Sequence, residues 1–153
     1  MSETHKCTLV PARFFDAGDA RCILSETYPL TGSEKVSFLE VPRYDAVLVY
    51  SSEDGNPPVL YELLAGLERC GEYNKILFHF GGGFMDLAIA QGERLLLANS
   101  YPAPDFTTAQ YYLFLAVKSL QLNPELSTVT AASDLTPEEE MSLYRYFKSV
   151  ERL

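Results

Sequence analysis

The stretch KILFHFGGGFMDLAIAQGERLLLANSY, residues 75–101, decides the fold that this chain is expected to adopt. It contains three apolar segments, residues 75–80, 84–90 and 94–101, separated by a glycine triplet and by a second short turn that contains Gly92. Turn-forming glycine between apolar runs is a strong local signal for a hairpin, and the many isoleucine, leucine and phenylalanine side chains suit a buried pleated surface. The stretch therefore predicts a three-stranded antiparallel meander.

Length and composition indicate a folded globular protein. The chain has 153 residues, 47% of them hydrophobic and 12% aromatic, which is enough apolar material for a full core. Its net charge of −9, from 21 acidic and 12 basic residues, repels the phosphates of nucleic acids and of anionic membranes. No apolar run is long enough to cross a bilayer, and residues 1–6 lack the features of a secretion signal. We therefore expect a cytoplasmic protein with no nucleic acid partner and no membrane insertion.

The first part of the chain predicts a strand that runs into a helix. An apolar stretch at residues 7–10 leads to Pro11, a position suited to a first helical turn. The segment Asp16-Ala17-Gly18-Asp19 either breaks that helix or begins a second one, and Pro29 ends the helical region. The pattern does not decide whether residues 11–29 form one helix or two.

Two strands and a helix are expected next. Residues 35–41 alternate as a half-exposed strand does, whereas residues 44–50 hold a continuous apolar run typical of a strand covered on both faces. Asn56 and Pro57 fit the N-cap and first position of a helix that ends at Gly71.

A helix, a strand and a final helix are predicted after the meander. The helix at residues 106–122 has an apolar stripe that widens almost around its axis, which predicts burial on two sides. Residues 126–132 then form a short strand, which a helical crossover should pair in parallel with residues 76–80. Thr136 and Glu139 fit a capping box for the final helix. Its inward residues are expected to be Met141, Tyr144, Phe147 and Val150.

Few side chains outside the glycine triplet indicate chemistry. The aromatic group formed by Tyr111, Tyr112 and Phe114 could line a ligand site, but packing in a core explains such a group better. Three widely spaced cysteines predict reduced thiols rather than disulfides or a zinc site: Cys7, Cys22 and Cys70. The sequence contains no nucleophile elbow, zinc protease motif, Walker A loop or dinucleotide fingerprint.

The segment HFGGGFMD, residues 79–86, carries a resemblance to a known motif. It aligns without gaps on D-x-G-G-G-T-x-D, the second phosphate motif of the superfamily of actin, sugar kinases and heat-shock chaperone ATPases. More closely, the chain resembles a bacterial family known as domain of unknown function 3822, a degenerate relative of that superfamily. This likeness rests on LVP, DAVLVY, KILFHF and RLLLANSY, and on the Tyr-Tyr pair in the helix that follows.

The resemblance implies a mixed α/β fold built from ribonuclease H-like, actin-like ATPase lobes. Residues 1–72 would form a partial first lobe, and residues 73–153 a second ribonuclease H-like lobe with the meander followed by helix, strand and helix. Family members extend further at both ends, so the first lobe is expected to lack its opening strands. An open sheet edge near residues 35–41 should then recruit a protein partner or a second copy of the chain.

The glycine triplet gives the candidate site residues. In the superfamily, backbone N–H groups of this turn hold phosphates, and acidic residues position magnesium and the attacking water. The resemblance therefore implies these phosphate-binding candidates: Gly81, Gly82, Gly83, Asp86 and His79. However, His79 replaces the leading aspartate, and Phe84 replaces the threonine. The alternative that we favour is a tight turn that needs positive φ, flanked by structural residues.

Two functions stay open at this point. The first is a non-catalytic actin-like scaffold or protein-interaction module, with no catalytic residues, no metal site and no cofactor. The second is an ATP-binding ATPase or phosphotransferase that uses the glycine turn as a phosphate cradle, with ATP and magnesium. The two substitutions in the motif favour the first function.

Overall fold

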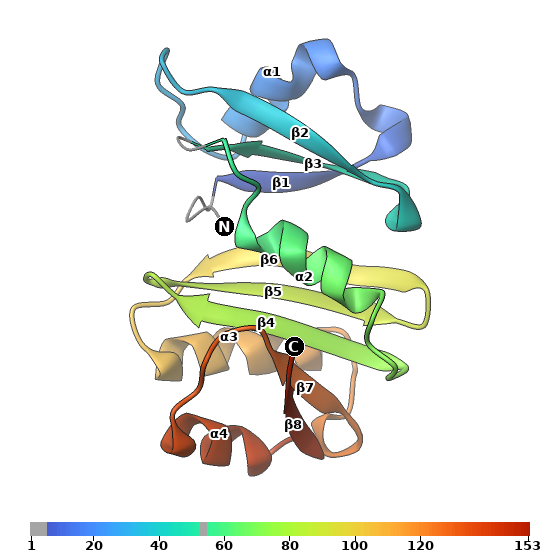
Figure 1. Cartoon of the computed structure of the whole chain (residues 1–153), viewed down its shortest axis with the longest axis vertical. Coiled ribbons are helices and arrows are strands. Elements are labelled where there is room, and N and C mark those ends of the chain that lie inside the picture. The colour runs from blue at the N-terminus through green and yellow to red at the C-terminus, as the bar shows by residue number, and fades with distance from the viewer. Residues whose placement is uncertain (1–5, 53–54) are drawn as a thin grey trace. The chain divides into compact units, whose positions relative to one another are not determined.

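The structure is a computed structural model that describes residues 6–52 and 55–153. Helices are interspersed among the strands of the chain, which gives the mixed α/β class that the sequence predicts (Figure 1). The chain divides into two compact units, Met1–Glu62 and Leu63–Leu153. Each unit has its own β-sheet and its own apolar core. The assignment of residues 1–72 and 73–153 to two lobes stays a prediction.

The first unit contains a three-stranded antiparallel sheet in the order β1-β3-β2. Its strands are β1 (Cys7–Pro11), β2 (Val36–Val41) and β3 (Ala46–Ser51). Every residue of β3 is buried, so the prediction of a central strand covered on both faces is confirmed. Val47 and Val49 of this strand pack with Ala20 and Leu24 to form the core of the unit.

The segment between β1 and β2 differs from the predicted helix. The strand continues through Pro11, and two 3-10 turns, η1 (Ala12–Phe14) and η2 (Ala17–Asp19), precede the short helix α1 (Ala20–Ser25). The Asp16 carboxylate accepts a hydrogen bond from the N–H of Gly18 at 2.9 Å, which begins a new turn there. Because this side chain competes with helical bonding, the helical region is broken.

The helix α2 (Val59–Leu67) begins two residues later than expected. Pro57 precedes Pro58, and a residue before proline is disfavoured in the helical conformation, so Pro57 does not occupy the first helical position. The helix also ends before Gly71, because the N–H groups of Arg69 and Cys70 bond to carbonyls three residues back. The boundary between the two units falls within α2.

The second unit contains a five-stranded sheet in the order β6-β5-β4-β7-β8. The antiparallel meander is confirmed as β4 (Asn74–Gly81), β5 (Phe84–Gln91) and β6 (Arg94–Pro102). The strand β7 (Thr128–Ala131) pairs in parallel with β4, as predicted, with Val129 opposite Ile76. This order, a meander whose first strand takes a parallel neighbour, is the ribonuclease H-like order that the resemblance implies.

The end of the chain corrects one prediction. The final helix α4 (Pro137–Tyr144) has the expected capping box, but it stops at Tyr144, and the chain returns as a fifth strand, β8 (Ser149–Arg152), parallel to β7. Of the four residues expected to point inward from this helix, Phe147 and Val150 are buried beyond its end, whereas Met141 and Tyr144 are exposed. The fully buried residue of α4 is Leu143, whose carbonyl accepts the N–H groups of Tyr146 and Phe147 and so closes the last turn.

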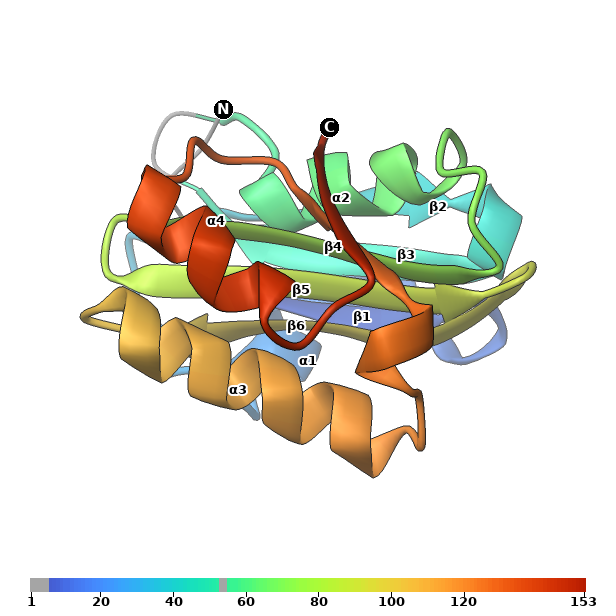
Figure 2. The same cartoon turned by 90° about the horizontal axis from the view of Figure 1, so that it is seen from below.

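The core of the second unit lies between the sheet and two helices. Figure 2 shows α4 and the longer α3 (Phe106–Ser119) on one face of the sheet. Phe78 and Leu87 of the sheet belong to the same buried cluster as Leu113 and Leu143 of the helices. The helix α3 ends at Ser119 rather than at residue 122. Within residues 6–52 and 55–153, the structure contains no helix with the length and hydrophobicity of a membrane span.

Candidate functional site

The glycine triplet lies where β4 turns into β5. Gly81 pairs with Phe84 as the last step of the ladder, so Gly82 and Gly83 form a two-residue hairpin loop. Both have positive φ, 63° and 82°, as the favoured two-residue hairpin turns require. A Cβ atom added at either glycine would meet nothing within 4 Å, so glycine is needed there for backbone conformation rather than for space.

His79 and Asp86 lie directly opposite each other on β4 and β5. Residues paired in this way point to the same face of a sheet, and Ser100 of β6 continues the row as the partner of Asp86. We call His79, Asp86 and Ser100 the polar row. It lies on the face opposite to Phe78, Met85 and the helices, because successive side chains in a strand alternate between faces.

Burial within the polar row increases from β4 to β5. Asp86 is 1% exposed, whereas His79 is half-buried. The Nδ1 atom of His79 is buried and has no hydrogen-bond partner among the described residues. The structure therefore brings together two of the five predicted candidates, and places the three glycines at the adjoining end of β4.

Ser100 is a member of the row that sequence reasoning missed. A register shift between Ile89 and Ala90 moves the pairing of β5 with β6 by one residue. If the pairing that begins with Gln91 and Arg94 continued along the two strands without the bulge, Asn99 would lie opposite Asp86. A bulge of this kind leaves no reliable signal in a single sequence.

Residues 56–150 match the model of a family described as proteins of unknown function, DUF3822. The chain belongs to this family. A search of curated proteins found no match.

Two solved structures resemble the chain and show its actin-like fold. The first is a Bacteroides thetaiotaomicron protein with actin-like ATPase fold and unknown function, with a TM-score of 0.80 and 16% identity over 98% of this chain. The second is a chain of the PilM–PilN type IV pilus biogenesis complex, with a TM-score of 0.51 and 14% identity over 96% of this chain. The DUF3822 chain spans 65% of the length of each of these structures.

The polar row of this DUF3822 chain is a poor donor set for magnesium phosphate. Magnesium prefers oxygen ligands in an octahedral arrangement and keeps several of its waters, which need room. The row supplies one carboxylate that is 1% exposed, faced by an imidazole. Phe84, the partner of Gly81 in the ladder, stands where the superfamily motif has a threonine, so the hydroxyl of that threonine is missing here. Among the residues that the structure describes, no three His, Cys, Asp or Glu side chains gather in a group that could hold a metal ion. The residues present do not fit the nucleotide site of the superfamily.

Proposed function

We propose that this DUF3822 protein is a non-catalytic actin-like scaffold or protein-interaction module. The observation that carries the proposal is the pairing of buried Asp86 with His79 across β4 and β5. In the superfamily motif both positions are acidic, and a hard cation needs those oxygens. An imidazole in place of one carboxylate removes one of the two charges that position magnesium and water, and the remaining carboxylate is 1% exposed.

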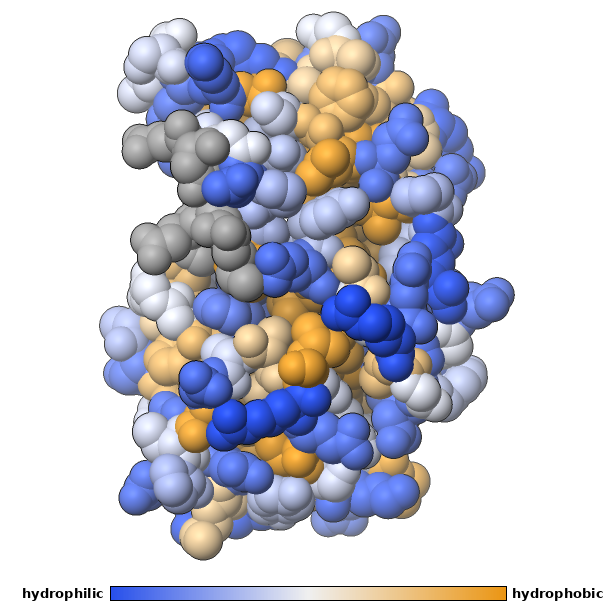
Figure 3. All heavy atoms as spheres, viewed as in Figure 1, coloured by the Kyte–Doolittle hydropathy of each residue, from blue (hydrophilic) through white to orange (hydrophobic). Residues whose placement is uncertain are grey.

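Two features support a role in protein interaction. One is the likeness to a chain of the PilM–PilN complex, since the matched chain was solved in a complex with another protein. The other is β2, one of the two edge strands of the first sheet, at the place where an open edge is predicted. Its Phe38 is 40% exposed, and an edge strand with exposed apolar side chains favours pairing with another chain. Figure 3 shows further apolar areas among hydrophilic side chains on one face of the molecule.

The proposal keeps four predictions from the sequence, which concern the lobes, the protein partner, nucleic acid and the cellular location. Residues 1–72 act as a partial first lobe and residues 73–153 as a second, and the partner is a protein or a second copy of the chain. Nucleic acid is not a partner, since the chain carries a net charge of −9. The protein acts in the cytoplasm.

Nucleotide binding and hydrolysis test the non-catalytic part. A ligand at a hundred times its dissociation constant stabilises a protein by about 2.7 kcal/mol, so millimolar magnesium ATP would raise the melting temperature of a nucleotide-binding protein visibly. We expect no shift and no hydrolysis above background, and Asp86→Asn should behave like the wild type. Ser100→Ala is the matched control in the polar row. The proposal would be contradicted if the wild type hydrolysed ATP and Asp86→Asn abolished that hydrolysis without changing the melting temperature.

Concentration-dependent light scattering tests the interaction part. Phe38→Lys places a charge on the β2 edge and should reduce self-association or binding to the partner. Phe14→Lys, at a position that is 68% exposed and outside β2, is the control and should leave association unchanged. Equal association of the two variants would exclude β2 as the interaction edge.

A further inference from the structure

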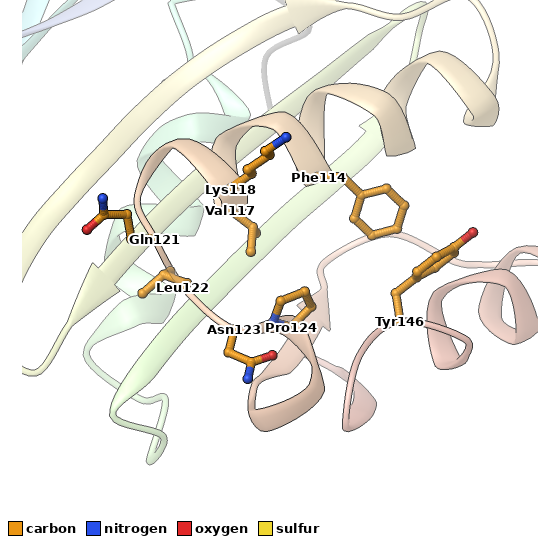
Figure 4. Close-up of a pocket in the computed structure, with 8 residues that line it drawn as sticks. All are labelled: Phe114, Val117, Lys118, Gln121, Leu122, Asn123, Pro124 and Tyr146. Carbon is orange, nitrogen blue, oxygen red and sulfur yellow. The ribbon is translucent and has the colours of Figure 1, made fainter.

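A hollow of about 640 Å³ lies in the second unit beside the C-terminal end of α3 (Figure 4). Small-molecule pockets commonly enclose roughly 300–1,000 Å³. The walls come from α3, from the segment that follows it, and from the segment between α4 and β8. The hollow shares no residue with the polar row or the glycine turn, so it is a site distinct from the one that the family motif indicates.

The interior of the hollow is apolar and its rim is polar. Phe114 and Tyr146 form an aromatic wall, with ring centroids 4.6 Å apart, and Val117 and Leu122 supply aliphatic surface. In Figure 4 the ammonium of Lys118, the amide of Gln121 and the hydroxyl of Tyr146 point away from the middle of the hollow. This arrangement suits a ligand with an apolar body and a polar group that stays at the rim.

The C-terminal end of α3 forms part of the rim. The helix α3 ends in a Schellman motif, in which the N–H of Leu122 bonds to the carbonyl of Val117 and the N–H of Gln121 to that of Lys118. Gln121 occupies the left-handed position of this motif, with φ 59°, where glycine is the usual residue. A glutamine at this position places an amide at the rim, which glycine would not provide.

The charge at the rim selects the kind of ligand. Among the described residues that line the hollow, Lys118 is the charged one, and no carboxylate is present, although the chain as a whole has a net charge of −9. The carbonyls at this end of α3 are occupied by the Schellman hydrogen bonds, which lessens their repulsion of an anion. We propose that the hollow binds a small amphiphilic carboxylate. Its apolar body lies between Phe114, Tyr146 and Leu122, and its carboxylate stays at the rim, where the exposed side chains of Lys118 and Gln121 turn toward it and donate hydrogen bonds. This site goes beyond the proposed interaction function and does not depend on it.

Titration of the whole chain with three probes of one chain length tests this inference. Decanoate, decan-1-ol and decyltrimethylammonium carry a negative, a neutral and a positive head group on the same apolar body. We expect saturable binding in calorimetry below the micelle concentration, in the order decanoate, decanol, ammonium, with NMR shifts at Val117 and Leu122. Absence of saturable decanoate binding, or equal affinities for the three probes, would overturn the proposal.

Lys118→Met tests the head-group contact. Because an exposed ion pair contributes little, decanoate affinity should fall about two- to fivefold, with decanol affinity unchanged. Lys35→Met removes the same charge from an exposed position of the first unit and should change neither affinity. Lys118 also lies in the last turn of α3, where a cation stabilises a helix, so the melting temperature of each variant is measured as well. If the two variants weaken decanoate equally, Lys118 is not the head-group partner and the proposal fails.

Gln121→Gly separates stability from binding. Glycine adopts a positive φ without strain, so this variant should melt about 2–4 °C higher than the wild type. The same change removes the amide from the rim and should weaken decanoate more than decanol. If the variant gains stability and still prefers decanoate to decanol as strongly as the wild type, the Gln121 amide does not contact the carboxylate and this part of the proposal is wrong.

Discussion

The two units differ in how their cores are built. In the first unit, one buried cluster joins Ala20 and Leu24 of a short helix to Val47 and Val49 of a strand, and Leu48 and Leu60 are buried as well. The second unit gathers its core from four strands of the sheet and from α3 and α4. Hydrophobic stabilisation scales with buried apolar area. Because the cluster of the second unit joins more strands and helices than that of the first, we expect the ribonuclease H-like unit to be the more stable of the two.

Truncation of a buried side chain in the core of the second unit should have the largest effect on the free energy of unfolding. Phe78 on β4 is 1% exposed, and Phe78→Ala leaves a cavity between the sheet and its helices. The expected loss is about 3–5 kcal/mol of unfolding free energy, measured by urea denaturation. Tyr73→Ala, at a position that is 67% exposed, is the control. A small loss for Phe78→Ala would show that the larger core is loosely packed and would break the comparison.

Truncation of the smaller core should act on the first unit alone. Leu24 is fully buried, and Leu24→Ala should destabilise by an amount near the lower end of roughly 2–5 kcal/mol, because a small core can collapse around the gap. Amide hydrogen exchange should accelerate in β1 and β3 and stay slow in β4 and β5. Equal acceleration in both sheets would mean that the two units unfold as one.

The tight turns of the two units offer a smaller test. Gly82 has φ 63° in open space, so Gly82→Val acts only through backbone strain and should destabilise by about 1–3 kcal/mol. Gly82→Asn is the control, because asparagine tolerates this conformation, and it should destabilise less. The first unit has a non-glycine residue in the same conformation, Asp45, with φ 50° in the turn between β2 and β3. Equal losses for the two variants of Gly82 would point to a contact of the turn rather than to its conformation.

The meander was predictable because its signals are local. A glycine turn between two apolar runs predicts the hairpin, so the sequence placed His79 on its first strand and Asp86 on its second. The register that sets the two residues opposite each other was not predicted, because Gly81 belongs to the strand and the loop has two residues rather than three. The parallel pairing of β7 with β4 followed from the handedness of crossovers. These features need no knowledge of distant contacts.

The missed features depend on tertiary contacts. The strand β8 is four residues long, and Val150 becomes part of a strand because Val129 of β7 lies beside it. The bulge that sets Ser100 opposite Asp86 is equally invisible in the local pattern. The hollow beside α3 is built from three separated segments, although Phe114 belonged to an aromatic group considered as a ligand site. A glutamine in the left-handed position at the end of a helix cannot be foreseen from its neighbours.

Acid titration should give the smallest difference between the units, through one carboxylate in each. In the first unit, the hydrogen bond from the Lys6 ammonium, 2.8 Å from Oε1 of Glu34, holds the pKa of that carboxyl below its usual value. In the second unit, the N–H of Thr108 donates to Asp105, the N-cap of α3, at 2.8 Å and lowers the pKa of that carboxyl. Because both pKa values are lower in the folded state, each contact stabilises above the ordinary carboxyl pKa. That stability is lost as the pH falls below the ordinary carboxyl pKa and through the lowered value of the folded state.

Salt separates the two contacts. The ion pair of Lys6 and Glu34 is screened at high ionic strength, whereas the cap at Asp105 is a short-range hydrogen bond to the backbone. Between pH 6 and pH 3 in low salt, the free energy of opening obtained from hydrogen exchange, after correction for the slower intrinsic exchange in acid, should fall in both units, and Glu34→Gln should remove part of that fall in the first. In about 1 M salt, the contribution of Glu34 should shrink and that of Asp105 should persist, with Asp105→Asn as the matched variant. Equal salt sensitivity of the two contributions would show that the Lys6 contact acts as a hydrogen bond rather than as an ion pair, and the two units would then respond to acid in the same way.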